Sequence, residues 1–444
     1  MKNIKLSLLA LFVGLSLLWL LADDMLSVPY ALFPLRASLI NYTGVLAIGA
    51  MSVGMLLAIR PRRIEPFLGG LDKSYRLHKW LGISALVLSI VHWLWAQGVK
   101  WLVGWGWLEK PVRKAAAATA EPSPIVDFLR SQRGLAEDLG EWAFYASVVL
   151  IVLALLKRFP YRWFFKTHRL LAIVYLVLVF HSVVLMKTAY WSSPIGPLMA
   201  VLMLAGSVAA GISLLRRVGH SRRVVGNIES LELHADNRVL GVGIQLQGSW
   251  AGHQAGQFAF VTFDPAEGPH PFTISSAWHD DGRLRFHIKG IGDYTASLPQ
   301  TLKVGDPVTV EGPYGRFDFG GAQPRQIWVA GGIGITPFIA RLQALAQQPD
   351  QRSVDLFYST AEPDQEFIQR LRALAESAQV KLHVLVSGRD GRLNAERLCQ
   401  QVPDWQDASV WFCGPAGFGQ ALRQDLVARG LPVADFHQEL FDMR

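Results

Sequence analysis

Six long apolar segments constrain the fold of this chain more than any other feature of its sequence. Each is long enough to cross a lipid bilayer as an α-helix, which takes roughly 17–25 apolar residues. The whole chain is 51% hydrophobic, which is high for an ordinary soluble protein. We therefore predict a multi-pass membrane protein whose first half is surrounded by lipid. The predicted spans cover about 6–22, 37–59, 78–97, 139–157, 168–186 and 194–215.

Basic residues indicate the orientation of these spans. The clusters at 60–63, 157–162 and 216–223 fall on one side if the spans alternate, and the positive-inside rule makes that side cytoplasmic. This placement explains the net charge of +8, so the charge does not indicate a nucleic-acid partner. The first segment has the position of a signal peptide, but its apolar stretch is long and "WLLADD" is a poor cleavage site. We expect an inner (plasma) membrane protein with its C-terminal half in the cytoplasm.

The pattern changes after Arg223. Short apolar runs separated by Gly, Pro and Asp predict a soluble, β-rich region, and from about 326 strands alternate with helical stretches. That alternation is typical of an α/β domain with a parallel sheet. The chain has two cysteines, Cys399 and Cys413, which excludes a disulfide framework, a zinc ribbon and the four thiolates of a typical iron–sulfur cluster.

Four histidines lie within the third and fifth predicted spans. His78 and His92 are 14 residues apart and His168 and His181 are 13 apart, which is roughly 20 Å along a helix in each case. Both spans run outward, so His78 is level with His168 near the inside, and His92 with His181 near the outside. Two facing pairs at two depths can each hold a haem iron between two imidazoles.

The helical angles fit this hypothesis unevenly. Fourteen residues fall about 40° short of four turns, so His78 and His92 share a face, whereas thirteen fall about 140° short. A bend, a π-bulge or differently rotated haems must absorb the difference at His168 and His181. A single intramembrane histidine is often only hydrogen-bonded to a neighbouring helix. Four histidines matched in depth favour haem ligation.

Two motifs in the β-rich region suit a flavin. "HPFTISSA" (270–277) places several hydroxyls at a strand end, where they and the backbone can hydrogen-bond a polar-edged ring. "IKGIGDYTASL" (288–298) predicts a loop that opens a short helix, whose N-terminal amides can bind a pyrophosphate beside Lys289. The ordinary alternatives are a loop cap and a capped helix start.

Two glycine-rich turns follow predicted strands in the last third of the chain. "VAGGIGITPF" (329–338) leads from a buried strand into a helix, and "WFCGPAGF" (411–418) repeats that pattern. Glycines let the backbone approach a phosphate, and a helix N-terminus supplies a favourable field. The two turns can meet at the carboxyl ends of one parallel sheet, where such folds bind ligands.

In this order the motifs resemble those of the ferredoxin–NADP reductase superfamily, in the form found in NADPH oxidases and ferric reductases. Behind the H-x13-H and H-x12-H spacings come "HPFTISSA", "GDYT", "GPYG", "GGIGITP" and "CGP". The resemblance implies a six-helix transmembrane bis-haem domain over 1–223. It further implies an antiparallel β-barrel FAD domain over 224–322 and an α/β parallel-sheet domain that binds the nicotinamide cofactor over 323–444.

The resemblance also implies roles for particular residues. His78, His92, His168 and His181 would ligate two b-type haems. Cys413 and Glu439 would lie by the nicotinamide ring, and Phe441 would cover the flavin until nicotinamide displaces it. The flavin and its pyrophosphate would contact His270, Pro271, Phe272, Thr273, Ser275, Ser276, Lys289, Gly292 and Thr295. The nicotinamide dinucleotide would contact Gly331, Gly332, Gly334, Thr336, Pro337, Gly414 and Pro415.

The implied function is transfer of electrons from cytoplasmic NADPH or NADH, through FAD and two haems, to an acceptor outside. The acceptor is left open between dioxygen and a ferric or cupric chelate, with a quinone or a periplasmic redox protein as further possibilities. The sequence indicates no obligate protein partner. Members that prefer NADPH commonly carry an arginine after the second strand of the nucleotide domain, where this chain has Ala361 and Glu362. We therefore expect NADH to be used at least comparably, unless Arg389 or Arg392 replaces that arginine.

Two alternatives to this function remain. In the first, the protein is a flavin reductase tethered to the membrane, and the histidines are structural. In the second, it is a transporter gated by a nucleotide-sensing domain. A reducible b-type haem spectrum discriminates against both alternatives.

Overall fold

The computed structural model describes residues 2–26, 32–109, 124–156 and 158–439. These residues form two compact units, one made of the apolar helices and a second that begins at Gly219. The expected domain boundaries at 223 and 322 stay predictions. Phe441 lies outside the described residues.

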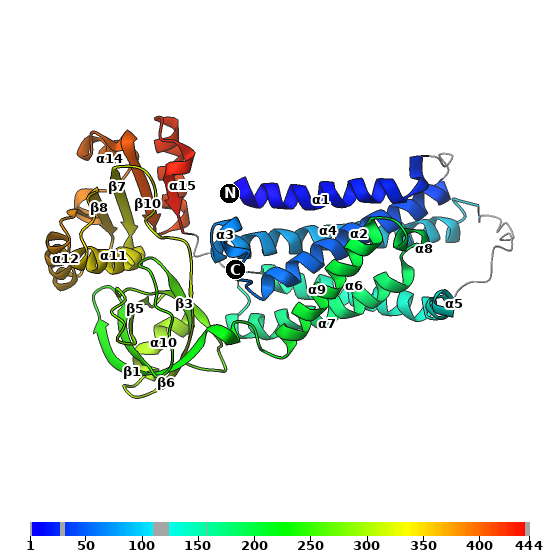
Figure 1. Cartoon of the computed structure of the whole chain (residues 1–444), viewed down its shortest axis with the longest axis horizontal. Coiled ribbons are helices and arrows are strands. Elements are labelled where there is room, and N and C mark those ends of the chain that lie inside the picture. Colours follow the sequence, from blue (N-terminus) through cyan, green and yellow to red (C-terminus); the bar gives the residue numbers. More distant parts are fainter. Residues whose placement is uncertain (1, 27–31, 110–123, 157, 440–444) are drawn as a thin grey trace. The chain divides into compact units, whose positions relative to one another are not determined.

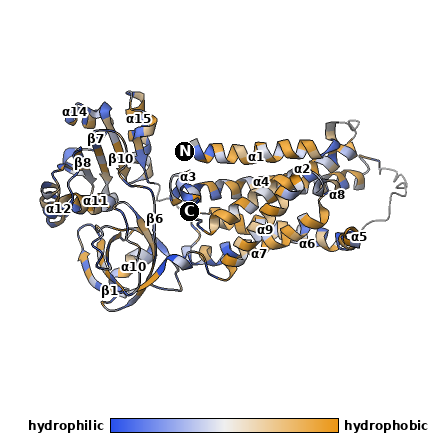
Figure 2. Ribbon diagram, in the orientation of Figure 1, coloured by the Kyte–Doolittle hydropathy of each residue, from blue (hydrophilic) through white to orange (hydrophobic). Residues whose placement is uncertain are grey.

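Within the described residues, six helices are long and apolar enough to cross a membrane, which confirms the predicted spans. In Figure 2 the ribbons of these helices carry mostly the colour of hydrophobic residues. Several run beyond the predicted limits because polar residues at a span's ends continue the helix into the interfacial region. The spans are α1 (Lys2–Ala22), α2 (Leu32–Ala58), α4 (Leu71–Gly104), α6 (Arg133–Leu155), α7 (Tyr161–Leu185) and α9 (Ile195–Leu214).

Small residues let the apolar helices pack closely. On α2, Gly49, Ala50 and Gly54 are buried, and this helix packs against α9 while α6 packs against α7. Close backbone approach of this kind drives helix association where lipid removes the hydrophobic force. Short helices α3 (Glu65–Leu68), α5 (Pro124–Ser131) and α8 (Thr188–Trp191) lie between the long ones.

The second unit contains an antiparallel sheet with the strand order β4-β3-β6-β1-β2-β5. A single bridge between Ile274 and Phe286 links the two edges of this sheet. The predicted barrel is therefore not fully closed, because that bridge replaces a continuous ladder of hydrogen bonds. The elements are β1 (Arg223–His234), β2 (Val239–Leu246), β3 (Phe258–Thr262), β4 (His270–Thr273), β5 (Arg283–Lys289), α10 (Asp293–Thr301) and β6 (Pro307–Tyr314).

A parallel sheet with the order β11-β10-β7-β8-β9 follows, as the alternation of strands and helices predicted. After β9 the chain returns to pair β10 with β7, so the strand order reverses between these two strands. The strands are β7 (Arg325–Gly331), β8 (Ser353–Thr360), β9 (Lys381–Val386), β10 (Ala408–Cys413) and β11 (Phe436–Gln438). The helices are α11 (Thr336–Gln347), α12 (Gln365–Ser377), α13 (Ser387–Asp390), α14 (Ala395–Gln401) and α15 (Ala416–Ala428).

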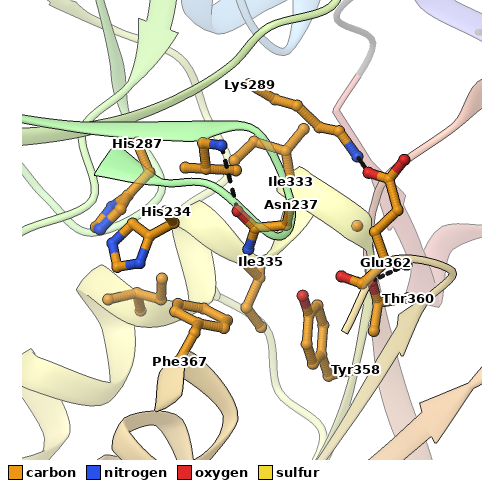
Figure 3. Close-up of a pocket in the computed structure, with 13 residues that line it drawn as sticks. His234, Asn237, His287, Lys289, Ile333, Ile335, Tyr358, Thr360, Glu362 and Phe367 are labelled. Atoms are coloured by element: carbon orange, nitrogen blue, oxygen red, sulfur yellow. Dashed lines mark hydrogen bonds and ion pairs between the residues drawn. The ribbon is translucent and has the colours of Figure 1, made fainter. Parts of the chain in front are cut away.

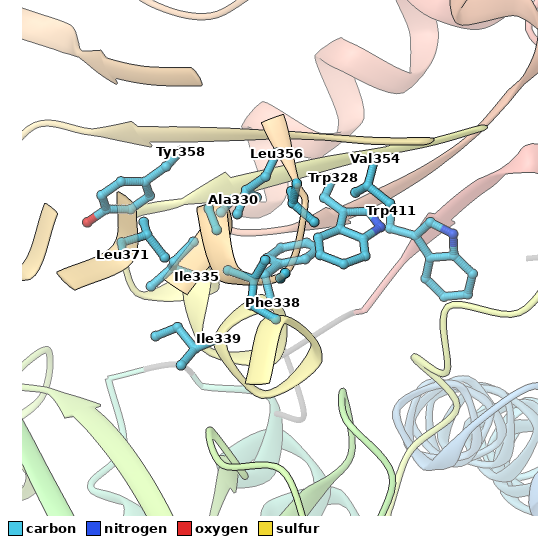
Figure 4. Packing of buried hydrophobic residues seen from close by; sticks show 14 of the residues in the cluster. Trp328, Ala330, Ile335, Phe338, Ile339, Val354, Leu356, Tyr358, Leu371 and Trp411 are labelled. Atoms are coloured by element: carbon cyan, nitrogen blue, oxygen red, sulfur yellow. The ribbon is translucent and has the colours of Figure 1, made fainter. Parts of the chain in front are cut away.

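Aromatic packing holds the parallel sheet rigid behind its glycine turns. Trp328 on β7 stacks on Phe338 of α11 with ring centroids 5.7 Å apart, and both side chains are fully buried. Leu356 of β8 and Leu371 of α12 complete this part of the core (Figure 4). The turn between β7 and α11 is therefore anchored at both ends by buried side chains.

Candidate functional site

His78 on α4 faces His168 on α7, with ring centroids 5.8 Å apart and the planes 67° apart. The Nδ1 of His78 lies 2.9 Å from the Gly54 carbonyl oxygen. Because that carbonyl can only accept, the Nδ1 donates and the Nε2 keeps its lone pair. The Nδ1 of His168 is buried and has no hydrogen-bond partner among the described residues.

His92 on α4 and His181 on α7 form a second pair, with ring centroids 6.2 Å apart and planes 74° apart. The Nδ1 of His92 donates to the Ile40 carbonyl at 2.9 Å, and that of His181 to the Ala136 carbonyl at 2.7 Å. A carbonyl partner at one ring nitrogen orients a histidine and leaves the other nitrogen free to bind a metal.

The spacing within each pair fits one metal ion between two imidazoles. Bonds of about 2.0–2.1 Å from imidazole nitrogen to a metal put the two ring centres roughly 6 Å apart. No group of three or more His, Cys, Asp or Glu side chains that could hold a metal occurs in the described part of the chain. Two-histidine sites suit haem iron, because the macrocycle supplies the remaining ligands.

Glycines make room for the outer pair. A Cβ atom on Gly140 of α6 would lie 1.9 Å from the Nδ1 of His181, and one on Gly44 of α2 would lie 3.3 Å from the Cε1 of His92. The helix α7 is α-helical throughout, which excludes the π-bulge among the three alternatives given for the angular difference. The pairs form without it, and the facing of the four histidines agrees with the sequence-based expectation.

The β4 motif places its aromatic residues in a stack. His270 stacks on Tyr294 of α10 with centroids 4.4 Å apart and on Phe272 at 6.4 Å. Burial lowers the pKa of His270 and raises the pKa of Tyr294 to about 12, so both side chains are neutral at pH 7. Pro271 and Thr273 belong to the same strand, which pairs with β3.

The two serines of this motif are hydrogen-bonded within the antiparallel sheet. The Ser275 hydroxyl donates to the Arg285 carbonyl at 2.9 Å and lies 2.7 Å from the Nδ1 of His287. The Ser276 hydroxyl accepts from the Arg285 N–H at 3.1 Å. These hydroxyls position β4 against β5, a role that the motif alone did not indicate.

The predicted pyrophosphate residues lie at the end of β5 and the start of α10. Gly292 is the N-cap of α10, and its N–H donates to the Thr295 hydroxyl at 3.1 Å. The Lys289 ammonium is 2.6 Å from a Glu362 carboxylate oxygen. The structure therefore brings Lys289 to the turn after β8, a partner that sequence patterns did not reveal.

The two glycine turns meet at the carboxyl ends of β7 and β10. A Cβ on Gly334 would lie 2.2 Å from the Cys413 carbonyl oxygen, and one on Gly331 would lie 2.8 Å from the Pro415 ring. Gly332 and Gly414 have φ values of +55° and +158°, which favour glycine. This contact lies where the strand order reverses, the place where open α/β sheets bind their ligands.

The remaining predicted residues surround these turns. Thr336 and Pro337 begin α11 and are buried. Cys413 is fully buried, and this burial raises the pKa of its thiol well above the usual value, with the nearby Glu439 carboxylate adding to the rise. Cys413 is therefore a neutral thiol at pH 7, and Glu439 is itself buried.

A pocket adjoins the first glycine turn (Figure 3). His234, Asn237, His287 and Lys289 come from the antiparallel sheet and its connections. Burial lowers the pKa of His287 to about 4. Sequence reasoning missed His234 and Asn237, because nothing in the β1–β2 connection distinguishes it from an ordinary turn. From the nucleotide-binding side the pocket is lined by Gly332, Ile333, Ile335, Ile339, Tyr358, Thr360, Glu362 and Phe367.

Three family models match successive parts of the chain. They are a ferric reductase like transmembrane component over residues 43–179, an FAD-binding domain over 230–318 and an oxidoreductase NAD-binding domain over 328–424. Together these matches give the chain an FAD-binding domain and an oxidoreductase NAD-binding domain after helices that are long and apolar enough to cross a membrane. The match to the ferric reductase like transmembrane component covers less than half of the chain.

Curated relatives match a smaller part of the chain. Flavohemoprotein A of Dictyostelium discoideum is 31% identical over 32% of this chain and 37% of its own length. The toluate 1,2-dioxygenase electron transfer component of Pseudomonas putida is 24% identical over 42% of this chain and 58% of its own. The chain thus spans less than two thirds of either relative.

Among solved structures, the FAD/NAD-binding domain of a nitric oxide dioxygenase from Vibrio cholerae O1 biovar El Tor is similar to this chain. It has a TM-score of 0.43 and 23% identity, and the match covers 49% of this chain and 97% of that domain. A flavohemoglobin from Malassezia yamatoensis covers 91% of this chain and 98% of its own, with a TM-score of 0.48 and 17% identity.

Proposed function

We propose that this protein transfers electrons from cytoplasmic NAD(P)H across a plasma membrane to a small-molecule acceptor, with FAD and two b-type haems as its cofactors. The family matches support an oxidoreductase that joins a membrane region to flavin and nicotinamide domains. The haem number, the direction of transfer and the acceptor are parts of the proposal.

The observation that carries the proposal is the presence of two facing histidine pairs at two depths between the same two helices. His78 and His92 both lie on α4, 14 residues apart, which is about 21 Å along the axis. Three of the four rings have Nδ1 bonded to a backbone carbonyl. A histidine with a purely structural role needs only a hydrogen bond to one neighbouring polar group. In these facing pairs, by contrast, the Nε2 atoms are available to bind one ligand between the two rings.

The residues of the second unit supply the donor side of the reaction. The glycine turns at Gly331 and Gly414 would hold the dinucleotide, and β4 would hold the flavin against the same sheet edge. FAD is required there because nicotinamide gives electrons in pairs and haem iron takes one. Cys413, kept neutral by burial, adds no charge beside the glycine turn where the nicotinamide ring would bind.

The basic clusters after the second, fourth and sixth spans support a cytoplasmic location for the nucleotide-binding unit. The acceptor then meets the protein on the opposite side, nearer His92 and His181. We propose dioxygen, with superoxide as product, or a ferric chelate. Assays for superoxide and for ferric-chelate reduction on one preparation distinguish these acceptors.

Haem content tests the proposal directly. Purified protein should contain about two b-type haems per chain, and His92→Ala or His181→Ala should each remove one while FAD is retained. His279→Ala is the matched control, since His279 is exposed outside the spans. Haem-free protein that still reduces its flavin would instead support the tethered flavin reductase. Haem-free protein without flavin reduction would leave the nucleotide-gated transporter as the better account.

A further inference from the structure

The Glu362 carboxylate lies between two cations from the antiparallel sheet. One oxygen is 2.6 Å from the Lys289 Nζ, drawn in Figure 3, and the other is 3.0 Å from a guanidinium nitrogen of Arg238. Lys289 ends β5, and Arg238 lies in the turn between β1 and β2. The carboxylate itself comes from the turn after β8, so the group joins two domains.

Local bonds hold these three residues in place. The Thr360 hydroxyl donates to the Glu362 carbonyl at 3.1 Å and accepts from its N–H at 3.2 Å, which fixes the turn after β8. Arg238 has a φ of +55°, and its carbonyl accepts from the Gly290 N–H at 3.0 Å. The β1–β2 turn is thereby tied to the residue that follows Lys289.

The position of this group relates it to the nucleotide. Glu362 and Lys289 line the same pocket as Gly332 of the first glycine turn. In open α/β sheets the adenosine ribose of a dinucleotide lies near the end of the second strand, where an acidic residue favours NAD and an arginine favours NADP. Here β8 is the second strand, and both kinds of residue are present together.

We propose that Glu362 is a specificity-determining residue that masks a cationic site for a ribose 2′-phosphate, so that the protein selects NADH. This inference rests on the proposed use of a nicotinamide cofactor. Arg238 supplies the guanidinium fork that suits a phosphate dianion, and Lys289, expected at the FAD pyrophosphate, adds positive charge beside it. The Glu362 carboxylate already accepts the hydrogen bonds of these two side chains. A bound 2′-phosphate would have to displace this carboxylate, which would then lie close to the phosphate as an unpaired negative charge.

Two observations strengthen the proposal. The ion pair with Lys289 lowers the pKa of the Glu362 carboxyl, so this group stays charged at pH 7. The Arg389 guanidinium, considered from the sequence as a substitute phosphate ligand, is paired with Asp390 at 2.9 and 3.0 Å. A ribose 2′-hydroxyl, by contrast, can donate a hydrogen bond to a carboxylate at no cost in charge.

Removal of the masking charge tests the proposal. FAD-loaded, full-length Glu362→Gln protein is compared with the parent by calorimetric binding of 2′,5′-ADP and of 5′-AMP, and by kcat/KM for NADPH and NADH. We expect the affinity for 2′,5′-ADP and the NADPH/NADH ratio to rise at least about tenfold, with 5′-AMP binding little changed. Arg238→Gln in the same background should remove most of that gain.

Glu366→Gln is the matched control. Glu366 is an exposed carboxylate on α12 that pairs with Arg370 and does not line the pocket. It should leave the NADPH/NADH ratio unchanged. Two results would overturn the masking role, provided that 5′-AMP binding is intact. One is an unchanged NADPH/NADH ratio in Glu362→Gln, and the other is a gain in that ratio that persists when Arg238 is also replaced. Failure of the parent to bind any of these nucleotides would overturn the proposed function as well.

Discussion

At the scale of single residues, the glycines beside the outer histidine pair decide whether a haem ligand can be placed there. Gly140 has no room for a side chain, because a Cβ atom would lie 1.9 Å from the Nδ1 of His181. The ring that would have to move is the one that donates to the Ala136 carbonyl. A substitution on α6 should therefore act on a ligand carried by α7.

Gly140→Ala should cost the protein one of the two proposed haems, with the FAD content unchanged. The displaced His181 ring loses its orienting carbonyl, an effect that typically weakens metal affinity by about 10- to 100-fold. Gly134→Ala on the same helix is the control, since nothing lies within 4 Å of its added Cβ. Haem-to-flavin ratios from absorbance measure both variants. A full complement of haem in Gly140→Ala would contradict the assigned outer pair.

Residue spacing predicted that the four histidines face one another in two pairs, because helical rise fixes their depth; their role as haem ligands stays a prediction. Residue spacing did not predict Gly140, because its importance depends on a helix that is distant in sequence. The same holds for the Lys289–Glu362 pair, whose members are 73 residues apart and meet only through the packing of two domains. His234 and Asn237 were missed for this reason too.

At the scale of elements, the contact between the two glycine turns is the structural basis of the candidate nucleotide site. The strand alternation predicted a parallel sheet, and the order β11-β10-β7-β8-β9 brings both turns to one edge of it. The antiparallel sheet was harder to predict, because its edges meet through the Ile274–Phe286 bridge and the hydrogen bonds of Ser275 and Ser276 to Arg285, which no local pattern specifies.

Gly334→Ala should separate these turns, because its Cβ would lie 2.2 Å from the Cys413 carbonyl oxygen. Overpacking of this kind costs about 1–3 kcal/mol, and relief requires β10 to shift from β7. We expect kcat/KM for NADH to fall at least about tenfold while FAD stays bound. Gly388→Ala, with open space around its Cβ, should behave like the parent. Stopped-flow flavin reduction at the parental rate in Gly334→Ala would argue against this site.

The antiparallel sheet should also be sensitive to acid. Burial lowers the pKa of His287 to about 4, below the unfolded value near 6.5. Unfolded protein therefore binds the proton first, so the stability contributed by neutral His287 is complete above about pH 6.5 and is lost as the pH falls toward 4. His253 and His270 shift in the same direction.

Thermal release of FAD, followed by its fluorescence between pH 7.5 and 4.5, measures this effect. In the parent, the midpoint temperature of FAD release should decrease as the pH is lowered below 6.5. In His287→Gln it should decrease less steeply over the same pH range. Ser275, which lies 2.7 Å from the Nδ1 of His287, should keep a hydrogen-bond partner in that variant. Equal pH dependence in the two proteins would show that other groups control acid stability.

At the scale of the whole molecule, one chain carries both a unit of membrane-spanning helices and a unit that contains the FAD- and NAD-binding regions. The family models place ferric reductase-like, FAD-binding and NAD-binding regions in one chain, and the two histidine pairs give the membrane unit a site at each of two depths. Both sets of features are necessary for electrons to cross the bilayer. The features of one unit alone do not distinguish electron transfer across the membrane from the alternative, a flavin reductase that acts at the membrane surface.

The most direct test uses parent protein in sealed liposomes with ferricyanide trapped inside and NADH added outside. If electrons cross the bilayer through the paired haems, the ferricyanide absorbance should fall at a rate that depends on NADH. His181→Ala should abolish that fall while external NADH still reduces the flavin, and His279→Ala should behave like the parent. Two results would contradict transmembrane transfer through paired haems. In the first, sealed parent vesicles reduce their flavin but never the trapped ferricyanide. In the second, His181→Ala vesicles reduce the trapped ferricyanide at the parental rate.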